Sequence, residues 1–458
     1  MTDTRGAAPA YVPATVKFGY SAGLFGISLV QTSVVVLLIL FYVDILGLSP
    51  ATAGLILFFG TFFDAIASMA AAWTAAHQRG ARGRYRPILI AVAGPLALCF
   101  ALLFTRPPLP ADIMWLWAIV LYLCYRICYA FTLTPHSAMI SCLSPDADER
   151  AAVGAWKAVA NNLGLMAAGY LGMGTIERLG RSDPARGFLV FGLVFGTIAG
   201  ASVLMSALMT RERPTAAGAA PDTADLLPAL GLILRNGQML AVLAATLAFF
   251  AAYTLLSGSI VYLFRYLTSA PQGAKLAVLM IGAAGLVTPP LWTGLIRRSS
   301  KAKVWAAGCI TIAAAFLLLY ATGMTALGPL MTLFFAVGAG KSAVIVNFYA
   351  MTADAVDHGQ WLQGRRVEAY AFGMLALANK VGTAVGGGLL GLLLSWSGIV
   401  AKSAAPPDID RLWLAVCAAP ALFAAASAGL ALLFRVDAAR HRALLADMAG
   451  RRIAANEG

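Results

Sequence analysis

Four charged side chains interrupt long apolar stretches of this sequence, and side chains of these types could bind an ion or exchange a proton. They are Asp64, Arg126, Lys341 and Lys380. Together they carry three positive charges and one negative charge. Buried charges in proteins are paired or face water, because an unpaired charge in an apolar environment is costly. One lysine can pair with Asp64, which leaves two cations without a fixed partner and favours an anionic substrate as their counter-ion.

These four residues suggest distinct roles. Arg126 is suited to bind a carboxylate or phosphate through two parallel hydrogen bonds, whereas Lys341 or Lys380 would supply a point charge. Asp64 beside Lys380 could exchange its ion-pair partner for a proton when a substrate arrives, which predicts proton coupling. A simpler interpretation stays open, in which Arg126 bonds carbonyls at a helix end and Lys341 lies nearer the cytoplasmic end of its helix. In that interpretation the remaining charged contact is a structural ion pair between Lys380 and Asp64.

Other polar or aromatic residues in the apolar runs are secondary candidates for a substrate site. Tyr20 and Tyr129 could stack on a ring-shaped substrate, although aromatic side chains at helical spacing are usually core residues. His136 follows Pro135 and titrates in a range that suits a proton relay, but a lone histidine is more often a hydrogen-bonded structural group. Asn347 offers hydrogen bonds, and most amides within membranes join helices.

The composition sets the class of protein that must position these side chains. Of 458 residues, 60% are hydrophobic and only 12% are charged, and apolar runs long enough to cross a bilayer recur along the chain. This predicts a polytopic membrane protein in a lipid bilayer. The net charge of +13 does not indicate nucleic acid, because the basic residues cluster in short loops. The six cysteines fall within apolar runs, so we expect no disulfides, no metal site and no cofactor.

The apolar runs predict an all-α fold of twelve transmembrane helices in two six-helix bundles. The first bundle, residues 18–210, has expected spans at 18–43, 51–76, 88–105, 113–143, 152–177 and 187–210. The second bundle, residues 237–434, has expected spans at 237–264, 273–297, 304–323, 325–353, 367–396 and 410–434. Residues 211–236 lack a spanning run and are predicted to be a cytoplasmic linker. Residues 1–17 and 435–458 are the two termini.

The basic residues also predict the orientation of the chain and an internal repeat. Placing both termini, the even-numbered loops and the linker in the cytoplasm gathers most Lys and Arg residues there. The basic cluster after the second span, Arg79 to Arg86, recurs after the eighth span as Arg297 to Lys303. Two similar halves suggest alternating access around a site near the middle of the membrane.

Several short motifs resemble one known family of transporters. They are KFGY at 17–20, FYVDILGLSPATAGLIL at 41–57, GRYRP at 83–87, SPDADER at 144–150, ADAVDHGQW at 353–361 and RRVEAYAF at 365–372. Over nearly its whole length the chain resembles the glycoside-pentoside-hexuronide:cation symporter family, the melibiose carrier group of the major facilitator superfamily. The resemblance implies secondary active transport of a small molecule in a bacterial inner membrane.

The chain departs from this family at the positions that hold sugars and cations. The family's sugar transporters carry aspartates where this chain has Leu24 and Leu133, so the usual disaccharide site is not supported. The second carboxylate of the family's Asp-Ala-x-x-Asp-Pro motif is Ser68 here, which leaves Asp64 with few oxygen ligands for sodium. We therefore expect a proton as the coupling ion. The two leucines also suit a hydrophobic or lipid-like substrate, and this alternative stays open.

The resemblance further implies a cytoplasmic gate made of charged loop residues. Acidic residues of both halves would pair with basic residues when the inner side is closed. The expected gate residues are Asp146, Glu149, Arg150, Lys157, Asp354, Asp357, Arg365, Arg366 and Glu368. Solvated charge runs are the simpler interpretation. One expected contact is missing, because Ala76 replaces the family's aspartate after the second span.

These patterns predict a secondary active transporter that moves a small polar, anionic solute, such as a sugar acid or glycoside, by proton-coupled alternating access. We expect a monomer in the bacterial inner membrane with both termini in the cytoplasm and no nucleic-acid partner. Uncoupled facilitation and export stay open. A membrane-embedded enzyme or a sensor is disfavoured, because the sequence shows no catalytic or metal-binding constellation and no appended soluble domain.

Overall fold

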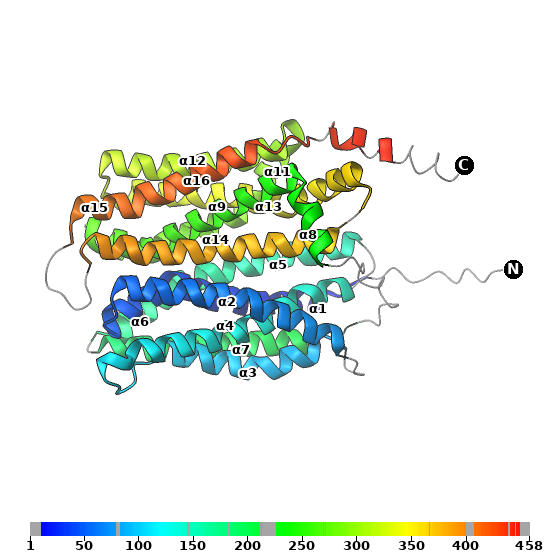
Figure 1. The fold of residues 1–458 in the computed structure, drawn as a ribbon. Helices are drawn as coiled ribbons and strands as arrows, with labels where there is room; N and C mark the ends of the chain where they lie inside the picture. Colours follow the sequence, from blue (N-terminus) through cyan, green and yellow to red (C-terminus); the bar gives the residue numbers. More distant parts are fainter. Residues whose placement is uncertain are drawn as a thin grey trace. The chain divides into compact units, whose positions relative to one another are not determined.

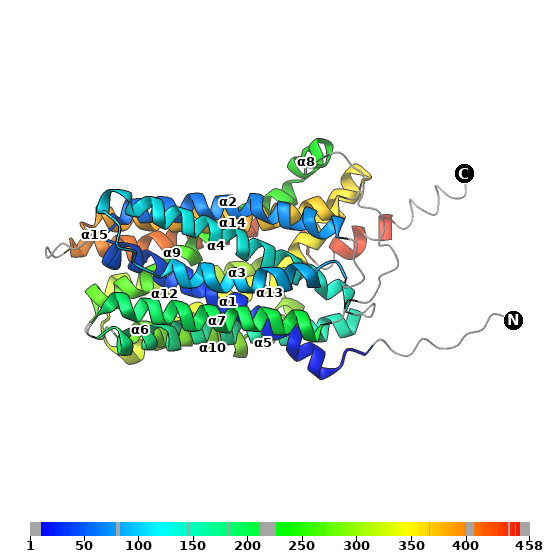
Figure 2. The ribbon, with the colours of Figure 1, turned by 90° about the horizontal axis from the view of Figure 1, so that it is seen from below.

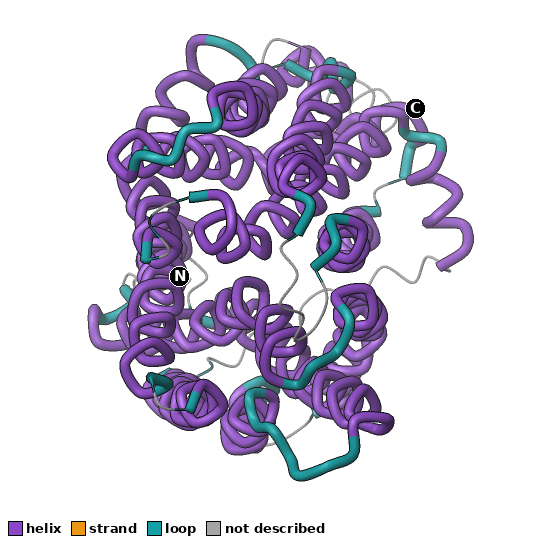
Figure 3. Tube along the Cα trace, turned by 90° about the vertical axis from the view of Figure 1, so that its left-hand side faces the viewer, coloured by secondary structure: helices purple, strands orange, loops and turns teal. Residues whose placement is uncertain are grey.

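The computed structural model describes residues 11–78, 83–143, 147–181, 183–210, 212, 226–268, 270, 272–365, 367–399, 407–437, 440–444 and 446–448. All regular structure in these residues is helical, as predicted (Figure 3). Within them, ten helices are long and apolar enough to cross a membrane, and one bent pair of helices makes an eleventh candidate span.

The bent pair replaces the single helix expected at 273–297. It consists of α10 (Gly273–Val287) and α11 (Pro289–Arg298), which are bent by 49° at the break between them. Pro289 and Pro290 stand at the break. Proline lacks the backbone N–H of the helix ladder and clashes with the preceding turn, so the sequence itself explains the bend.

The remaining predicted span, 152–177, is helical but less apolar than the others. It corresponds to α5 (Ala147–Ala167), a π-helical turn and α6 (Met173–Leu179). Asn161, Asn162 and several glycines lower its hydropathy, which is why it is not among the candidate spans. Ser28 Oγ of the first helix donates to Asn161 Oδ1 at 2.6 Å, so this polar residue is used between helices.

The chain divides into two compact units, one made of Met1–Ser49 and Phe62–Gly218 and the other of Pro50–Thr61 and Ala219–Gly458. In the first unit α1 packs against α5 and α7, and α3 packs against α4 and α7 (Figure 1). The bounds are Ala14–Leu40 for α1, Arg86–Leu103 for α3, Met114–Met139 for α4 and Pro184–Met209 for α7. The helix α2 (Pro50–His77) contributes residues to both units.

The second unit repeats this packing pattern. Here α9 packs against α14 and α16, and α12 packs against α13 and α16. The bounds are Gly237–Tyr262 for α9, Lys301–Thr322 for α12, Leu327–Gln363 for α13, Glu368–Trp396 for α14 and Ala419–Leu432 for α16. Figures 1 and 2 show α3 beside α7 in the first unit and α9 beside α14 in the second. Corresponding helices of the two units therefore make corresponding contacts.

Two short helices complete the second unit. The helix α8 (Leu226–Leu234) lies in the segment predicted as a linker, is too short to span a bilayer and packs on α9, α13 and α14. The helix α15 (Ile409–Trp413) leads through a π-helical turn into α16. Asn236 caps α9 by accepting from the Met239 N–H, and its side chain also donates to the carbonyl of Ala355 in α13.

Close glycine contacts hold the helix that carries one of the four charges. A Cβ added at Gly308 of α12 or at Gly340 of α13 would collide with the backbone of the other helix. A Cβ at Gly338 would lie 2.7 Å from the Cα of Ile281 in α10. Small residues allow helices to approach in this way, and here they fix the part of α13 next to Lys341.

Candidate functional site

Asp64 and Arg126 form a buried ion pair inside the first unit. Arg126 Nη2 of α4 donates to Asp64 Oδ2 of α2 at 2.7 Å, and the two side chains are only 3% and 1% exposed. A guanidinium stays protonated at any accessible pH, so its charge must be balanced where it is buried. Removing Asp64 would leave the charge of Arg126 uncompensated in the helix bundle.

Neutral groups surround the same guanidinium. Arg126 Nη1 donates to Gln31 Oε1 of α1 at 3.2 Å. The rings of Tyr122 and Tyr129 lie 5.8 and 5.3 Å from the guanidinium carbon. These tyrosines are one helical turn before and after Arg126, so they share its face of α4. Arg126 is thus held by α1, α2 and its own helix.

This arrangement changes the expected role of Arg126. Arg126 was expected to be available for a substrate while Asp64 paired with Lys380, but the structure gives Asp64 an arginine partner within its own unit. The reason is tertiary, because it depends on which faces of α2 and α4 meet. Lys380 is half-buried in the fourth turn of α14, in the other unit, and its pairing with Asp64 stays a prediction.

Tyr20 and His136 join α1 to α4. The Tyr20 hydroxyl donates to the His136 carbonyl at 2.7 Å, and His136 Nε2 donates to the Tyr20 carbonyl at 2.9 Å. Their rings stack with centroids 4.4 Å apart, and Ser206 of α7 donates to the same Tyr20 carbonyl. Both side chains are fully buried. In this structure the two side chains join α1 to α4. Their predicted role in binding a substrate would require these hydrogen bonds to break.

Lys341 of the second unit lacks a carboxylate partner among the described residues. Its Nζ donates to the Tyr253 hydroxyl of α9 at 3.0 Å and lies 4.6 Å from the centre of that ring. Lys341 is half-buried in the fourth turn of α13. A cation that contacts only a neutral hydroxyl and an aromatic face keeps its full charge. Lys341 therefore differs from Arg126, whose charge Asp64 balances.

Asn347, the other predicted substrate residue of α13, bonds its own helix. Its Nδ2 donates to the Ala343 carbonyl at 2.8 Å, and the side chain is fully buried. Within the described part of the chain its Oδ1 is buried without a hydrogen-bond partner. An unsatisfied buried acceptor is costly, so this atom is a candidate for a contact with a ligand or water.

The predicted gate residue of the first unit, Glu149, pairs with Lys17. Lys17 Nζ lies 2.8 Å from Glu149 Oε2, and the Val12 N–H donates to the same oxygen at 3.2 Å. These hydrogen bonds, first that from Lys17 and then that from Val12, lower the pKa of the Glu149 carboxyl. The contact ties the start of α1 to the start of α5.

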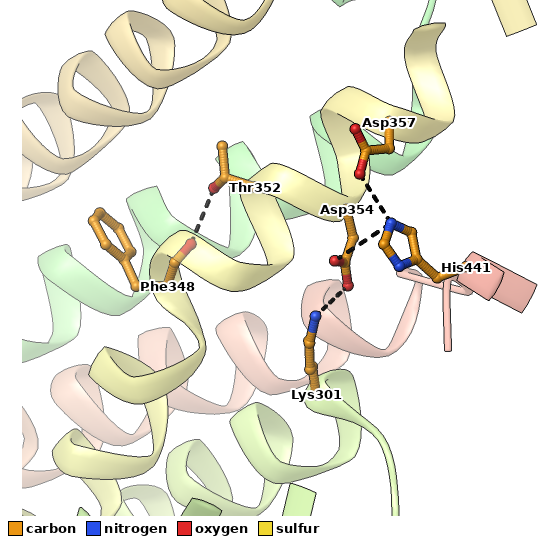
Figure 4. Close-up of polar contacts among 6 residues, drawn as sticks. All are labelled: Lys301, Phe348, Thr352, Asp354, Asp357 and His441. Carbon is orange, nitrogen blue, oxygen red and sulfur yellow. Dashed lines mark hydrogen bonds and ion pairs between the residues drawn. The ribbon is translucent and has the colours of Figure 1, made fainter. Parts of the chain in front are cut away.

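Asp354 and Asp357, the predicted gate carboxylates of the second unit, meet two basic residues (Figure 4). Asp354 Oδ2 accepts from Lys301 Nζ of α12 at 2.6 Å. His441 Nε2 lies 2.9 Å from Asp357 Oδ2 and 3.9 Å from Asp354 Oδ1. Nearby, Trp361 Nε1 donates to Asp447 Oδ2 at 2.6 Å. Residues of the C-terminal segment thus dock on the last turns of α13.

The remaining predicted gate residues lie in or beside helices α5, α13 and α14. Arg365 is exposed between α13 and α14, Glu368 is exposed at the start of α14, and Lys157 is half-buried in α5. Asp146, Arg366 and the side chain of Arg150 lie outside the described residues. The gate as a whole stays a prediction.

Sequence reasoning missed the partners more often than the charged residues themselves. Gln31 and Tyr253 are ordinary polar residues within apolar runs, and no local signal links them to Arg126 or Lys341. Lys301 was recognised only as part of a basic loop. Its role follows from its place at the first position of α12, after the cap Ser300.

Comparisons with known proteins show the family of the chain. The family model described as MFS/sugar transport protein matches residues 19–438. A Salmonella typhimurium protein named as a sulfoquinovose importer is 26% identical, with 84% of this chain and 81% of that protein covered. The glucuronide carrier protein homolog of Escherichia coli is 22% identical, with 85% of each covered. The isoprimeverose transporter of Lactiplantibacillus pentosus is 25% identical, with 86% and 82% covered.

A solved structure shows the same fold. The crystal structure of a D-xylose–proton symporter matches with a TM-score of 0.67, at 14% sequence identity, and covers 92% of this chain and 98% of that one. Together with the family match, it confirms the family resemblance and the major facilitator fold predicted from the sequence.

Proposed function

We propose that this chain, which belongs to the MFS/sugar transport protein family, moves a small polar anionic solute. The chain is a multi-pass membrane transporter and not an enzyme. The observation that carries the proposal is the uneven charge within its helices. Asp64 balances Arg126, whereas Lys341 contacts only the neutral Tyr253 among the described residues. An anionic solute would supply the missing negative charge.

The names of the relatives include acidic and neutral substrates. Sulfoquinovose carries a sulfonate and a glucuronide carries a carboxylate, whereas isoprimeverose is uncharged. The family therefore includes carriers named for acidic and for neutral sugars. In this chain Leu24 and Leu133 stand where the resembling sugar carriers have aspartates, and the basic residues remain. The loss of two carboxylates while the basic residues remain favours an acidic sugar or a similar organic anion.

The Asp64–Arg126 pair suggests how a proton accompanies the solute. While the pair is intact, the guanidinium of Arg126 binds the Asp64 carboxylate. An anionic group that binds Arg126 takes the place of Asp64, and the displaced carboxylate binds a proton. One anion and one proton are carried together. Lys380, the other basic residue of the proposal, would adjust the proton affinity of the site.

The same proposal covers orientation and assembly. The basic ends of α11 and α12, at Arg297, Arg298 and Lys301, would face the cytoplasm together with both termini. The carrier would work as a monomer in the bacterial inner membrane by alternating access.

Uptake by proteoliposomes tests the substrate class. The probes are methyl glucuronide, sulfoquinovose and the neutral isoprimeverose. We expect uptake of at least one of the two anions, and Arg126→Gln and Lys341→Gln should each lower it by roughly tenfold or more. Lys303→Gln, which removes an exposed charge at the start of α12, is the matched control. Unchanged anion uptake in both site variants would show that these cations do not bind the solute.

Imposed ion gradients test the coupling. An inward proton gradient should drive anion uptake in the parent protein. Asp64→Asn, which keeps the size of the side chain but cannot titrate, should abolish the response to the gradient. If this variant retains uptake with the same pH dependence as the parent, proton coupling through Asp64 is wrong.

A further inference from the structure

In each unit, a cation on the fourth spanning helix donates to a neutral hydrogen-bond acceptor on the first spanning helix. In the first unit Arg126 of α4 donates to Gln31 of α1 at 3.2 Å. In the second unit Lys341 of α13 donates to Tyr253 of α9 at 3.0 Å. The corresponding helices, α1 with α4 and α9 with α13, are in contact within each unit.

The two pairs also correspond in their positions along the helices. Gln31 and Tyr253 both lie in the fifth turn of their helices, and Arg126 and Lys341 both lie in the fourth turn of theirs. The sequence does not repeat at these positions, because an amide is matched by a phenol and an arginine by a lysine. What repeats is the chemistry, a cation that donates to an uncharged acceptor on the partner helix.

We propose that Gln31 and Tyr253 are positioning residues for anion transport, each holding its cation in place without cancelling its charge. This inference rests on the proposed function, in which Arg126 and Lys341 bind the solute. A carboxylate in either position would neutralise the cation and compete with the solute. An amide or phenol oxygen accepts one hydrogen bond and leaves the positive charge for the anion.

Gln31 would still hold Arg126 in place after the solute has displaced Asp64. When Asp64 gives up its partner to the solute, the guanidinium would lose its shortest contact. Gln31 on Nη1 and the rings of Tyr122 and Tyr129 are the contacts that remain. The buried Arg126 Nε has no hydrogen-bond acceptor among the described residues, so a donor is left for the incoming anion.

Around Lys341 the phenol contributes in two ways. Its hydroxyl accepts from Nζ, and its ring face lies 4.6 Å from the same atom. The Tyr253 ring is nearly parallel to that of Phe249, at 12° and 6.2 Å between centroids, which fixes the plane of the phenol. An ammonium has three donors, so two remain for the solute after the bond to Tyr253.

Conservative variants separate positioning from a structural role. Gln31→Met keeps length and flexibility but replaces the amide oxygen, and Tyr253→Phe keeps the ring. We expect each to raise the KM for the transported anion by roughly tenfold, with little change in the maximal rate. The controls are Thr197→Val of α7, whose hydroxyl bonds only its own helix, and Tyr320→Phe of α12, which is exposed. Neither control should change the KM.

Moving the carboxylate from position 64 to position 31 provides a second test, and this test needs no substrate. Asp64→Asn should lower the thermal stability of the ligand-free protein, because it leaves Arg126 buried without a carboxylate. Adding Gln31→Glu to that variant should restore the stability, because the new carboxylate lies next to the same guanidinium. Gln31→Glu alone should abolish anion uptake in a stable protein.

The outcomes distinguish this inference from the function on which it rests. If the parent protein takes up neither anion, the proposed function is wrong. If the parent takes up an anion and both Gln31→Met and Tyr253→Phe retain its KM, only the positioning role is wrong. Failure of Gln31→Glu to restore the stability lost in Asp64→Asn would also contradict the placement of Gln31 beside Arg126.

Discussion

Arg126 Nη2 donates to Asp64 Oδ2 at 2.7 Å, and neither side chain is more than 3% exposed. This contact joins α2 to α4 inside one unit and balances Arg126, which is more deeply buried than Lys341 or Lys380. It also links stability to function, because the group that balances Arg126 in this structure is the one that a bound anion would replace.

The first prediction concerns the stability of this pair. Asp64→Asn or Arg126→Gln should each lower the free energy of unfolding by about 3–5 kcal/mol, because each breaks the buried ion pair. The double variant should be more stable than either single variant. Thermal unfolding of the purified proteins in detergent measures this. Equal losses that add in the double variant would show that the two side chains do not interact.

The second prediction concerns sodium. A Na⁺ ion at Asp64 would lie next to the guanidinium that already binds Asp64 Oδ2, and two like charges in one buried site repel each other. We therefore expect that an imposed sodium gradient does not drive anion uptake and that sodium does not raise the melting temperature. A sodium-dependent rise in melting temperature that is lost in Asp64→Asn would contradict this.

The third prediction concerns acid pH at the start of α1. Lys17 and the Val12 N–H lower the pKa of Glu149 below its ordinary value of 4.5. A lowered folded pKa adds stability above the ordinary value, and this contribution is lost as the pH falls through the folded value. The melting temperature of the parent should exceed that of Glu149→Gln at pH 7, and the difference should shrink below pH 4.5. A difference that grows in acid would contradict the assignment.

The fourth prediction concerns the C-terminal segment. His441 contacts Asp357, and Asp447 accepts from Trp361, so residues 440–444 and 446–448 are held on α13 through two side chains. His441→Ala together with Trp361→Phe should make this segment more accessible to a protease. Lys301→Gln is the control, because it leaves both of these contacts in place. Equal cleavage of the parent and the double variant would contradict the docking.

Much of the fold follows from the sequence. The apolar runs predicted the helices, and the paired prolines at 289 and 290 explain why one of them is bent. The sequence motifs predicted the family. These properties depend on hydropathy and on local backbone chemistry, which each segment carries by itself.

The site was only partly predictable. The sequence identified Asp64, Arg126 and Lys341 as unusual, because a charge within an apolar run is visible without any structure. It could not identify their partners. Asp64 and Arg126 are 62 positions apart, and Arg126 and Gln31 are 95 apart.

Which acceptor a buried charge meets depends on the rotation and crossing of helices, to which every packed residue contributes. By itself the sequence determined that this protein spans a membrane and carries excess positive charge within its helices. Only the tertiary structure decided that Arg126 is balanced by Asp64 while Lys341 is held by a neutral phenol. The physical reason is that hydropathy is a property of single residues, whereas an ion pair requires two helix faces to meet.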